Sequence, residues 1–384
     1  MPDIKKVFKY IGIVVAVCFI ASCSRTISTP VPTLLPFPTE SIKLTQESAT
    51  AIPAIIFNET PTATPTSPAL QIVTGTPIVA TTAYPTADPS MVTSGMILYN
   101  TSTGNADFYS VRGSGEIELL NNYPYWNTTW NIFPGNFDDD NITDLLFYDP
   151  NYGYVEFYAT DGYGYIYRMS MYSGWRLNWE IIPGDFNNDK YTDVLLFDPN
   201  YGDAEFYTTD GYGNIILLER HKDWRKTWKI YPGMFNGDLL TDLFFYDPTT
   251  GDAEIHFSDG DGNLTLQNSI TGINKTWSVI PGNYVGELYT DLLLYDSGSG
   301  MAELHSSDGE GNLTLVQEFT DWKKGLSIIP GKYVDPVKTS LVFYDPASGE
   351  AELKSFGEDG SLTVVTKYTG WTGSLKIIPG KFTE

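Results

Sequence analysis

Short runs of apolar residues, each followed by a polar turn, recur throughout residues 95–384. One stretch, residues 228–270, reads WKIYPGMF, TDLFFYDP, GDAEIHFSD and GNLTLQNSI once the intervening residues are removed. Each run is rich in β-branched and aromatic residues, and Asp-Pro, Asp-Gly and Gly-Asn turn signals separate the runs. The pattern therefore predicts four short β-strands in this stretch.

This four-strand unit repeats with a constant period. The dipeptide Pro-Gly marks the unit, and successive copies lie 49 residues apart without an insertion. The prolines concerned are Pro134, Pro183, Pro232, Pro281, Pro330 and Pro379. A period of about 20 to 50 residues indicates a solenoid, a propeller or another repeat array, and four strands per repeat are typical of a propeller blade.

The two ends of the repeat region carry complementary parts of one unit. The segment SGMILYN, residues 94–100, aligns with the second strand of the next unit, whereas the final LKIIPGKFTE contains only a first strand. Pairing of the ends would complete a blade and remove exposed strand edges. We therefore predict an all-β fold over residues 95–384, a six-bladed β-propeller closed by the C-terminal strand. An open β-solenoid is the alternative.

Residues 1–94 precede the repeats and divide into two parts. Residues 1–23 place lysines ahead of an apolar run that is too short for an ordinary membrane span, as in a secretory signal. The ending Ile20-Ala21-Ser22-Cys23 resembles the bacterial lipobox, which implies lipidation of Cys23. A plain signal peptide or an amino-terminal membrane anchor is the alternative. Residues 24–94 are rich in Pro, Thr and Ser, which predicts an extended tether.

These features predict an exported protein that touches the membrane only through its lipid anchor. The repeat region would then face the extracellular space or the periplasm. The two cysteines of the chain, Cys18 and Cys23, both lie in the signal, so the stability of the repeat region must come from burial or metal rather than from disulfides.

A loop rich in oxygen-bearing side chains joins the first two predicted strands in several repeats. In GDFNNDKYTD, residues 184–193, such side chains stand at alternate positions. Calcium takes about six to eight oxygen ligands, and a single loop with side chains at positions 1, 3, 5 and 9 and a backbone carbonyl near position 7 can wrap one ion. We predict one or two structural Ca²⁺ sites, with a polar Asx turn as the alternative. The expected ligands are Asp185, Asn187, Asp189, the Tyr191 carbonyl and Asp193, and in the preceding repeat Asn136, Asp138, Asp140, the Ile142 carbonyl and Asp144.

The stretch PGDFNNDKYTDVLLFD, residues 183–198, resembles the FG-GAP or VCBS-type repeat of bacterial surface proteins. It is also similar to the blades of integrin alpha-chain propellers. The resemblance covers residues 95–384 and implies a propeller with calcium in the Asp-rich loops. Some proteins with this type of repeat are lectins. The motif indicates the fold specifically, whereas it says little about the function.

Two columns of tryptophan run through the repeats. The first, in the first strand, predicts core positions and consists of Trp130, Trp179, Trp228 and Trp277, continued by Leu326 and Leu375. The second lies in the loop that enters the first strand, beside basic residues, which suits stacking against a sugar ring. Packing of each ring between adjacent blades is the alternative. The candidate ligand-binding residues are Trp126, Trp175, Arg176, Trp224, Arg225, Trp322 and Trp371.

An acidic column repeats in all six units, and we expect it to form hydrogen bonds within each blade. Its members are Asp107, Glu156, Glu205, Glu254, Glu303 and Glu352. A catalytic pair needs two different environments, whereas a repeated column gives each carboxylate a similar one. The three histidines, His221, His256 and His305, form no motif, so we predict no catalytic residues and no enzyme activity.

Charge and repetition bound the function that the sequence predicts. A net charge of −24 argues against nucleic acid as a partner. The favoured hypothesis is a monomeric, calcium-stabilised, cell-surface module with lectin-like binding of carbohydrate or a glycoconjugate. The alternative is a protein-interaction scaffold or adhesin, with one asymmetric site where the repeats differ, as at Ile273 or His221.

Overall fold

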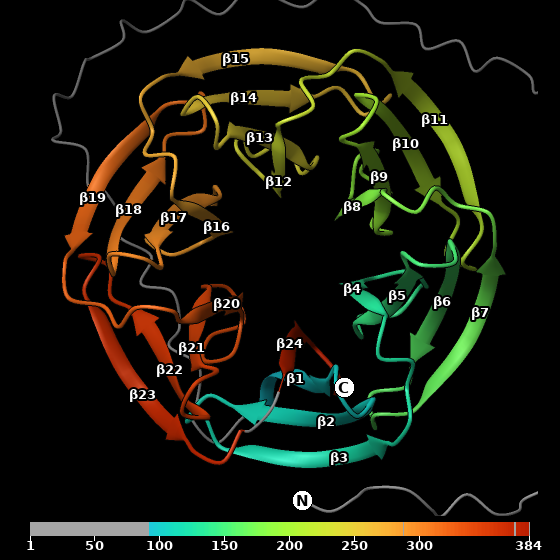
Figure 1. Ribbon diagram of the computed structural model, residues 1–384, viewed down its shortest axis with the longest axis vertical. Coiled ribbons are helices and arrows are strands. Elements are labelled where there is room, and N and C mark those ends of the chain that lie inside the picture. The colour runs from blue at the N-terminus through green and yellow to red at the C-terminus, as the bar shows by residue number, and fades with distance from the viewer. Residues whose placement is uncertain (1–91, 287, 372–373, 384) are drawn as a thin grey trace, which may run out of the picture. The chain divides into compact units, whose positions relative to one another are not determined.

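The computed structural model describes residues 92–286, 288–371 and 374–383. Within this part of the chain, 24 strands form six four-stranded antiparallel sheets arranged as a ring (Figure 1). The predicted all-β, six-bladed propeller is therefore confirmed. Its first strand begins at Val92, three residues before the predicted boundary. The signal sequence, Cys23 and almost all of the tether lie outside the described residues.

The first three blades share one order of strands, which runs from the centre of the ring outward. Blade 1 contains β24 (Leu375–Gly380), β1 (Val92–Asn100), β2 (Asn105–Arg112) and β3 (Ile117–Tyr123). Blade 2 contains β4 (Asn131–Gly135), β5 (Asp144–Asp149), β6 (Tyr154–Thr160) and β7 (Ile166–Tyr172). Blade 3 contains β8 (Glu180–Gly184), β9 (Asp193–Asp198), β10 (Asp203–Thr209) and β11 (Ile215–His221).

The other three blades follow the same order. Blade 4 contains β12 (Lys229–Gly233), β13 (Asp242–Asp247), β14 (Asp252–Ser258) and β15 (Leu264–Ile270). Blade 5 contains β16 (Ser278–Gly282), β17 (Asp291–Asp296), β18 (Met301–Ser307) and β19 (Leu313–Phe319). Blade 6 contains β20 (Ser327–Gly331), β21 (Ser340–Asp345), β22 (Glu350–Phe356) and β23 (Leu362–Tyr368).

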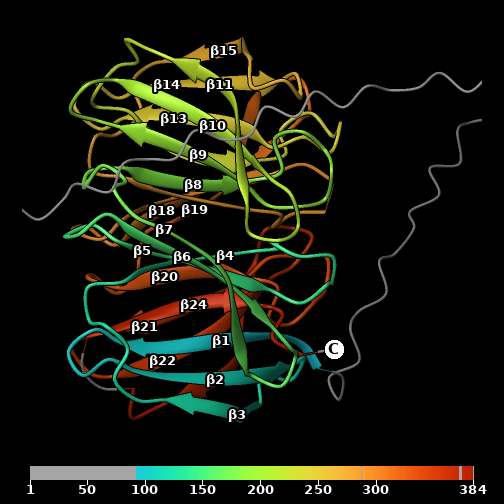
Figure 2. The same ribbon diagram turned by 90° about the vertical axis from the view of Figure 1, so that its right-hand side faces the viewer.

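The ring has two faces, which carry different loops. The strands run from one face to the other (Figure 2), and neighbouring strands are antiparallel. Loops between the first and second strands, which include the Asp-rich loops, therefore lie on one face, which we call the Asp-loop face. The loops that connect consecutive blades and carry the second tryptophan column lie on the opposite face, which we call the Trp-loop face.

The core lies between blades rather than within one sheet. The second strand of each blade is buried on both sides, so its sequence is a continuous apolar run such as DLLFYD in β5. One hydrophobic cluster joins each pair of adjacent blades. Between blades 2 and 3, for example, Val155 and Phe157 pack against Trp179, Ile181 and neighbouring residues.

The two ends of the described region complete one blade together. Strand β24 pairs with β1 in antiparallel register, from Gly95 opposite Gly380 to Asn100 opposite Leu375. The Ser94 Oγ atom also donates a hydrogen bond to the Gly380 carbonyl at 3.0 Å. Among the described residues, no helix is long and apolar enough to cross a membrane.

Removal of residues 375–384 should destabilise the ring severely. The deletion exposes the edge of β1 and removes the buried side chains of Ile377, Ile378 and Phe382. Each such side chain contributes about 1.5–3 kcal/mol, so we expect a loss of about 5 kcal/mol or more, with aggregation. Thermal unfolding and size-exclusion chromatography measure the effect. Deletion of residues 383–384 alone is the control, and an equally large effect of the control would contradict this explanation.

Candidate functional site

A buried carboxylate at the start of the second strand organises each Asp-rich loop. In blade 2, the Asp144 carboxylate accepts hydrogen bonds from the backbone N–H groups of Phe137, at 2.8 Å, and Thr160, at 2.9 Å. Asp193, Asp242 and Asp291 make the corresponding bonds in blades 3 to 5. The carboxylate thus ties the loop to the end of the third strand. The sequence predicted this position only as a metal ligand.

Burial makes these carboxylates unusually weak acids. Desolvation raises the pKa of Asp144 and of Asp193 to about 7, and that of Asp242 to about 6. The hydrogen bonds that these carboxylates accept from backbone N–H groups lower the pKa, but they offset only part of the effect of burial. A cation bound beside such a carboxylate would favour its charged form.

The two predicted calcium loops differ in geometry. Carboxylate oxygens of Asp138, Asp140 and Asp144 all lie within 4.8 Å of one another. The Asn136 Oδ1 atom of the same loop is buried and has no hydrogen-bond partner among the described residues. Four oxygen atoms of the kind that Ca²⁺ prefers are therefore present in this loop, and three of them are close together, so the residues fit the ion.

In the loop of blade 3, side chains bond to the loop itself. The Asp185 carboxylate accepts hydrogen bonds from the backbone N–H groups of Asp189 and Lys190. The Asn187 Nδ2 atom donates to Asp189 Oδ2 at 2.8 Å. The backbone N–H of Tyr191 donates to Asp189 Oδ1, just as that of Ile142 donates to Asp140 Oδ1. The carboxylates of Asp185, Asp189 and Asp193 do not form a convergent group of the kind seen in blade 2.

The second tryptophan column lies between blades on the Trp-loop face. Trp126 contacts Tyr99, Phe108 and Tyr123 of blade 1 and Phe147 of blade 2. Trp224 and Trp322 bridge the following blades in the same way, through Phe245 and Phe343. Trp175 contacts Tyr148 and Tyr172, and Trp371 contacts Tyr344 and Tyr368. The rings therefore occupy the interblade positions that the sequence analysis considered as the alternative to sugar stacking.

The two candidate arginines are held in ion pairs within the ring. Arg176 pairs with Asp198 and Asp203 at 2.9 and 2.8 Å, and its guanidinium lies 4.7 Å from the Trp179 ring. Arg225 repeats this arrangement with Asp247, Asp252 and Trp228. These groups cover the first tryptophan column in blades 3 and 4.

The acidic column forms hydrogen bonds within each blade, as predicted. The partner is usually the residue two positions later on the third strand. Glu156 and Glu205 accept hydrogen bonds from the hydroxyls of Tyr158 and Tyr207, respectively. Glu254 and Glu303 bond in the same way to His256 and His305, and Glu352 forms an ion pair with Lys354. In blade 1, Asp107 accepts hydrogen bonds from Asn105 and Asn122.

Three clefts open between blades, and each lies where one tryptophan column is interrupted. The cleft between blades 4 and 5 has Ile273 in place of a second-column tryptophan. The clefts between blades 5 and 6 and between blades 6 and 1 have Leu326 and Leu375 in place of a first-column tryptophan. At the other three interfaces both columns carry tryptophan. Departures from the repeat were therefore the sequence signal for these clefts.

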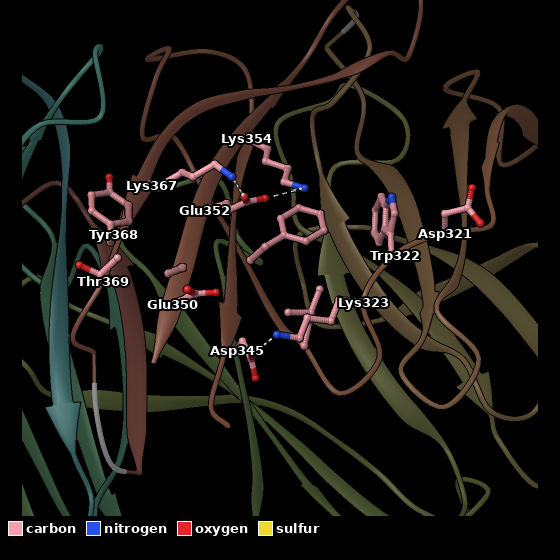
Figure 3. A pocket seen from close by; sticks show the side chains of 13 residues that line it. Asp321, Trp322, Lys323, Asp345, Glu350, Glu352, Lys354, Lys367, Tyr368 and Thr369 are labelled. Carbon is pink, nitrogen blue, oxygen red and sulfur yellow. Dashed lines mark hydrogen bonds and ion pairs between the residues drawn. The ribbon is translucent and has the colours of Figure 1, made fainter. Parts of the chain in front are cut away.

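The cleft between blades 5 and 6 has a volume of about 300 Å³ and combines aromatic and charged walls. Figure 3 shows Lys354 and Lys367 pointing toward Glu352 from either side, and Lys323 toward Asp345. The Lys354 ammonium also lies 4.4 Å from the Phe343 ring, which Trp322 meets edge-on. Both lysines raise the acidity of Glu352, so its pKa lies below the usual range. The sequence analysis did not single out Lys354, Lys367 or Phe343.

Comparisons with known proteins give no family. No protein-family model matches the chain, and no curated protein matches it. Among solved structures, a protein from Lactobacillus plantarum is 10% identical with a TM-score of 0.47, over 74% of this chain and 99% of that one. The periplasmic gluconolactonase of Pseudomonas aeruginosa is also 10% identical, with a TM-score of 0.46 and the same coverage. A functionally unknown protein from Desulfotomaculum acetoxidans is 13% identical with a TM-score of 0.44, over 74% and 98%. These similarities are weak, and the propeller assignment rests on the strand pairing of this chain.

The raised pKa of Asp242 predicts a pH-dependent contribution to stability. A carboxyl group has a pKa of about 3.9 when unfolded, and that of Asp242 is about 6 when folded, so folding favours its protonated form. This contribution is full below about pH 4 and is lost as the pH rises through about 6. In Asp242→Ser, which copies Ser340 of blade 6, it should be absent.

Urea unfolding at several pH values, with chelator present, measures this effect. Between pH 4 and 7 the free energy of unfolding should fall more in the original chain than in Asp242→Ser. After solvent screening the difference should be on the order of 1–2 kcal/mol. Parallel pH profiles for the two proteins would show that Asp242 does not titrate in this range.

Proposed function

We propose that this chain is an exported binding module that is anchored through lipid on Cys23. It binds carbohydrate in the cleft between blades 5 and 6, and one Ca²⁺ in blade 2 stabilises the ring. The proposal includes no catalytic step. The observation that carries it is the cleft, which combines aromatic edges with lysine and carboxylate groups.

The chemistry of this cleft suits a sugar. Apolar C–H faces of a sugar ring pack against aromatic groups, and the partly exposed Trp322 lines this cleft. Hydroxyl groups need both donors and acceptors, and the cleft offers ammonium donors on Lys354 and carboxylate acceptors on Glu352. Glu352 and Lys354 are 30% and 19% exposed, so a ligand can reach both groups.

Calcium in the blade 2 loop would have a structural role. Asp138, Asp140 and Asp144 would hold the ion with help from the Asn136 side chain. The ion would offset the mutual repulsion of the carboxylates, which contributes to a raised pKa of Asp138 after the larger effect of burial. Thr192 of blade 3 bonds to Asn136 of this loop, so ordering of the loop would also support the neighbouring blade.

Binding of a protein is the second candidate function, and exposed tyrosines favour it. Tyr125, Tyr152, Tyr201 and Tyr212 are between 66% and 90% exposed. Tyrosine is enriched at protein interfaces because it is large, rigid and amphipathic.

Calcium should stabilise the protein, and Asp138→Asn should remove most of that effect. Saturation at about 100 times the dissociation constant contributes about 2.7 kcal/mol, which predicts a rise of several degrees in Tm. The control is Asp189→Asn in the loop of blade 3, at the position that corresponds to Asp140, and it should keep the response. Scanning calorimetry with calcium and with chelator gives the comparison. An equal response in Asp138→Asn and the original chain would refute the blade 2 site.

Carbohydrate binding should depend on Glu352. A glycan array first identifies a sugar ligand, and calorimetry then compares Glu352→Gln with Glu254→Gln, the same repeat position between blades 3 and 4. Loss of a charged hydrogen bond costs about 1.5–3 kcal/mol, so we expect Glu352→Gln to weaken binding by roughly 10-fold to 100-fold. The control should bind like the original chain. A blank array from folded protein would reject the carbohydrate proposal and favour a protein partner.

A further inference from the structure

The backbone that carries the second tryptophan column is held identically at all six interblade positions. In each case the N–H of the column residue donates to the carbonyl of a glycine in the turn between the second and third strands of the preceding blade, over 2.8 to 3.2 Å. The donors are Trp126, Trp175, Trp224, Ile273, Trp322 and Trp371. Five copies place an indole between blades, and only the side chain differs at Ile273. The five tryptophan positions can therefore be compared directly with Ile273, because the backbone is the same.

Where an aromatic residue follows on the next blade, the indole makes the same contacts. Trp126, Trp224 and Trp322 meet a phenylalanine of the next second strand edge-on, with ring centroids 4.9, 5.2 and 4.8 Å apart. Each also lies beside a ring at the end of the preceding outer strand. Those neighbours are Tyr123, His221 and Phe319. Three rings therefore pack together at each of these interfaces.

Between blades 4 and 5 all three rings are replaced by aliphatic side chains. Ile270 stands at the end of the outer strand, Ile273 in the tryptophan column and Leu294 in the next second strand. A cleft of about 430 Å³ remains there, large enough for a small ligand. Asn274 takes the place of Arg176 and Arg225, so no guanidinium covers Trp277 as it covers Trp179 and Trp228.

One wall of this cleft is polar. Glu303 and His305 line it, with His305 Nε2 at 2.8 Å from Glu303 Oε2. A carboxylate has room for further hydrogen bonds after this one, so Glu303 can accept a proton donor from a ligand. The cleft therefore combines the aliphatic side chains of Ile270, Ile273 and Leu294 with a carboxylate that can accept an N–H group.

We propose that the cleft between blades 4 and 5 binds a small aromatic ligand whose indole-sized ring carries an N–H donor. The ring takes the place that a tryptophan of the chain occupies at the other interfaces, and Glu303 accepts the N–H. This site is separate from the carbohydrate cleft between blades 5 and 6, and neither site requires the other.

Indole itself is the probe. Saturation-transfer NMR and calorimetry on the full chain should show one site with a dissociation constant on the order of 1 mM or tighter, as expected for so few ligand atoms. 1-Methylindole, which lacks the donor, should bind at least several-fold more weakly. Ile273→Trp should abolish binding, because it fills the cleft with the side chain that the other five positions carry.

Two further variants keep the test decisive. Leu294→Phe introduces into the cleft, from the opposite blade, the side chain that Phe147, Phe245 and Phe343 have at this repeat position, and it should also remove binding even if Ile273→Trp does not fold. Leu375→Trp is the matched control, since it adds the same ring to a different cleft and should leave binding unchanged. Absence of indole binding by the original chain, or full binding by a folded Ile273→Trp or Leu294→Phe, overturns the proposal.

These results are independent of the carbohydrate experiment. Ile273→Trp should leave sugar binding intact, and Glu352→Gln should leave indole binding intact. A failure of one proposal therefore does not resemble a failure of the other.

Discussion

In blades 2 to 5 a two-residue unit, threonine followed by aspartate, connects the blade both to itself and to the blade before it. The Asp193 carboxylate binds the Asp-rich loop of its own blade to the end of the third strand. Its neighbour Thr192 exchanges two hydrogen bonds with Asn136 of the preceding blade, at 2.6 and 2.8 Å. Equivalent threonine bonds join five of the six interfaces, and the carboxylate is buried in four blades. The positions of the loops, and therefore of any metal site in them, depend on this unit.

The six repeats are equivalent in backbone and unequal in side chains. Blades 2 to 4 carry the Asp-rich loops, and the interfaces that lead into them are filled by paired tryptophans. The remaining interfaces each lack one tryptophan, and there the clefts open. The paired tryptophans therefore fall in one half of the ring, and the three clefts described above fall in the other half. A repeat protein can separate stability from binding in this way, because each interface contributes independently to the whole.

The sequence predicted the fold well because the fold is periodic. The 49-residue spacing and the half-units at the two ends indicated the number of blades and the pairing of β24 with β1. The sites were harder to predict, because loops with similar composition differ in geometry. Asp138, Asp140 and Asp144 converge, whereas Asp185, Asp189 and Asp193 do not, and the Asp185 carboxylate bonds to the N–H groups of Asp189 and Lys190. That difference depends on backbone geometry that the spacing of carboxylates does not reveal. Likewise, a tryptophan column alone does not show whether its rings face solvent or the next blade.

Closure by the last strand also constrains the order in which the protein can fold. Ser94 and Gly380 are bonded although they lie 286 positions apart, so blade 1 has no innermost strand until β24 has been made and, in an exported protein, translocated. Contacts of such high sequence separation form slowly. Until then β1 presents a free edge that other chains can pair with, and a product of incomplete translation keeps that edge permanently. A closed native ring can therefore form only from a chain that was translated through all six repeats.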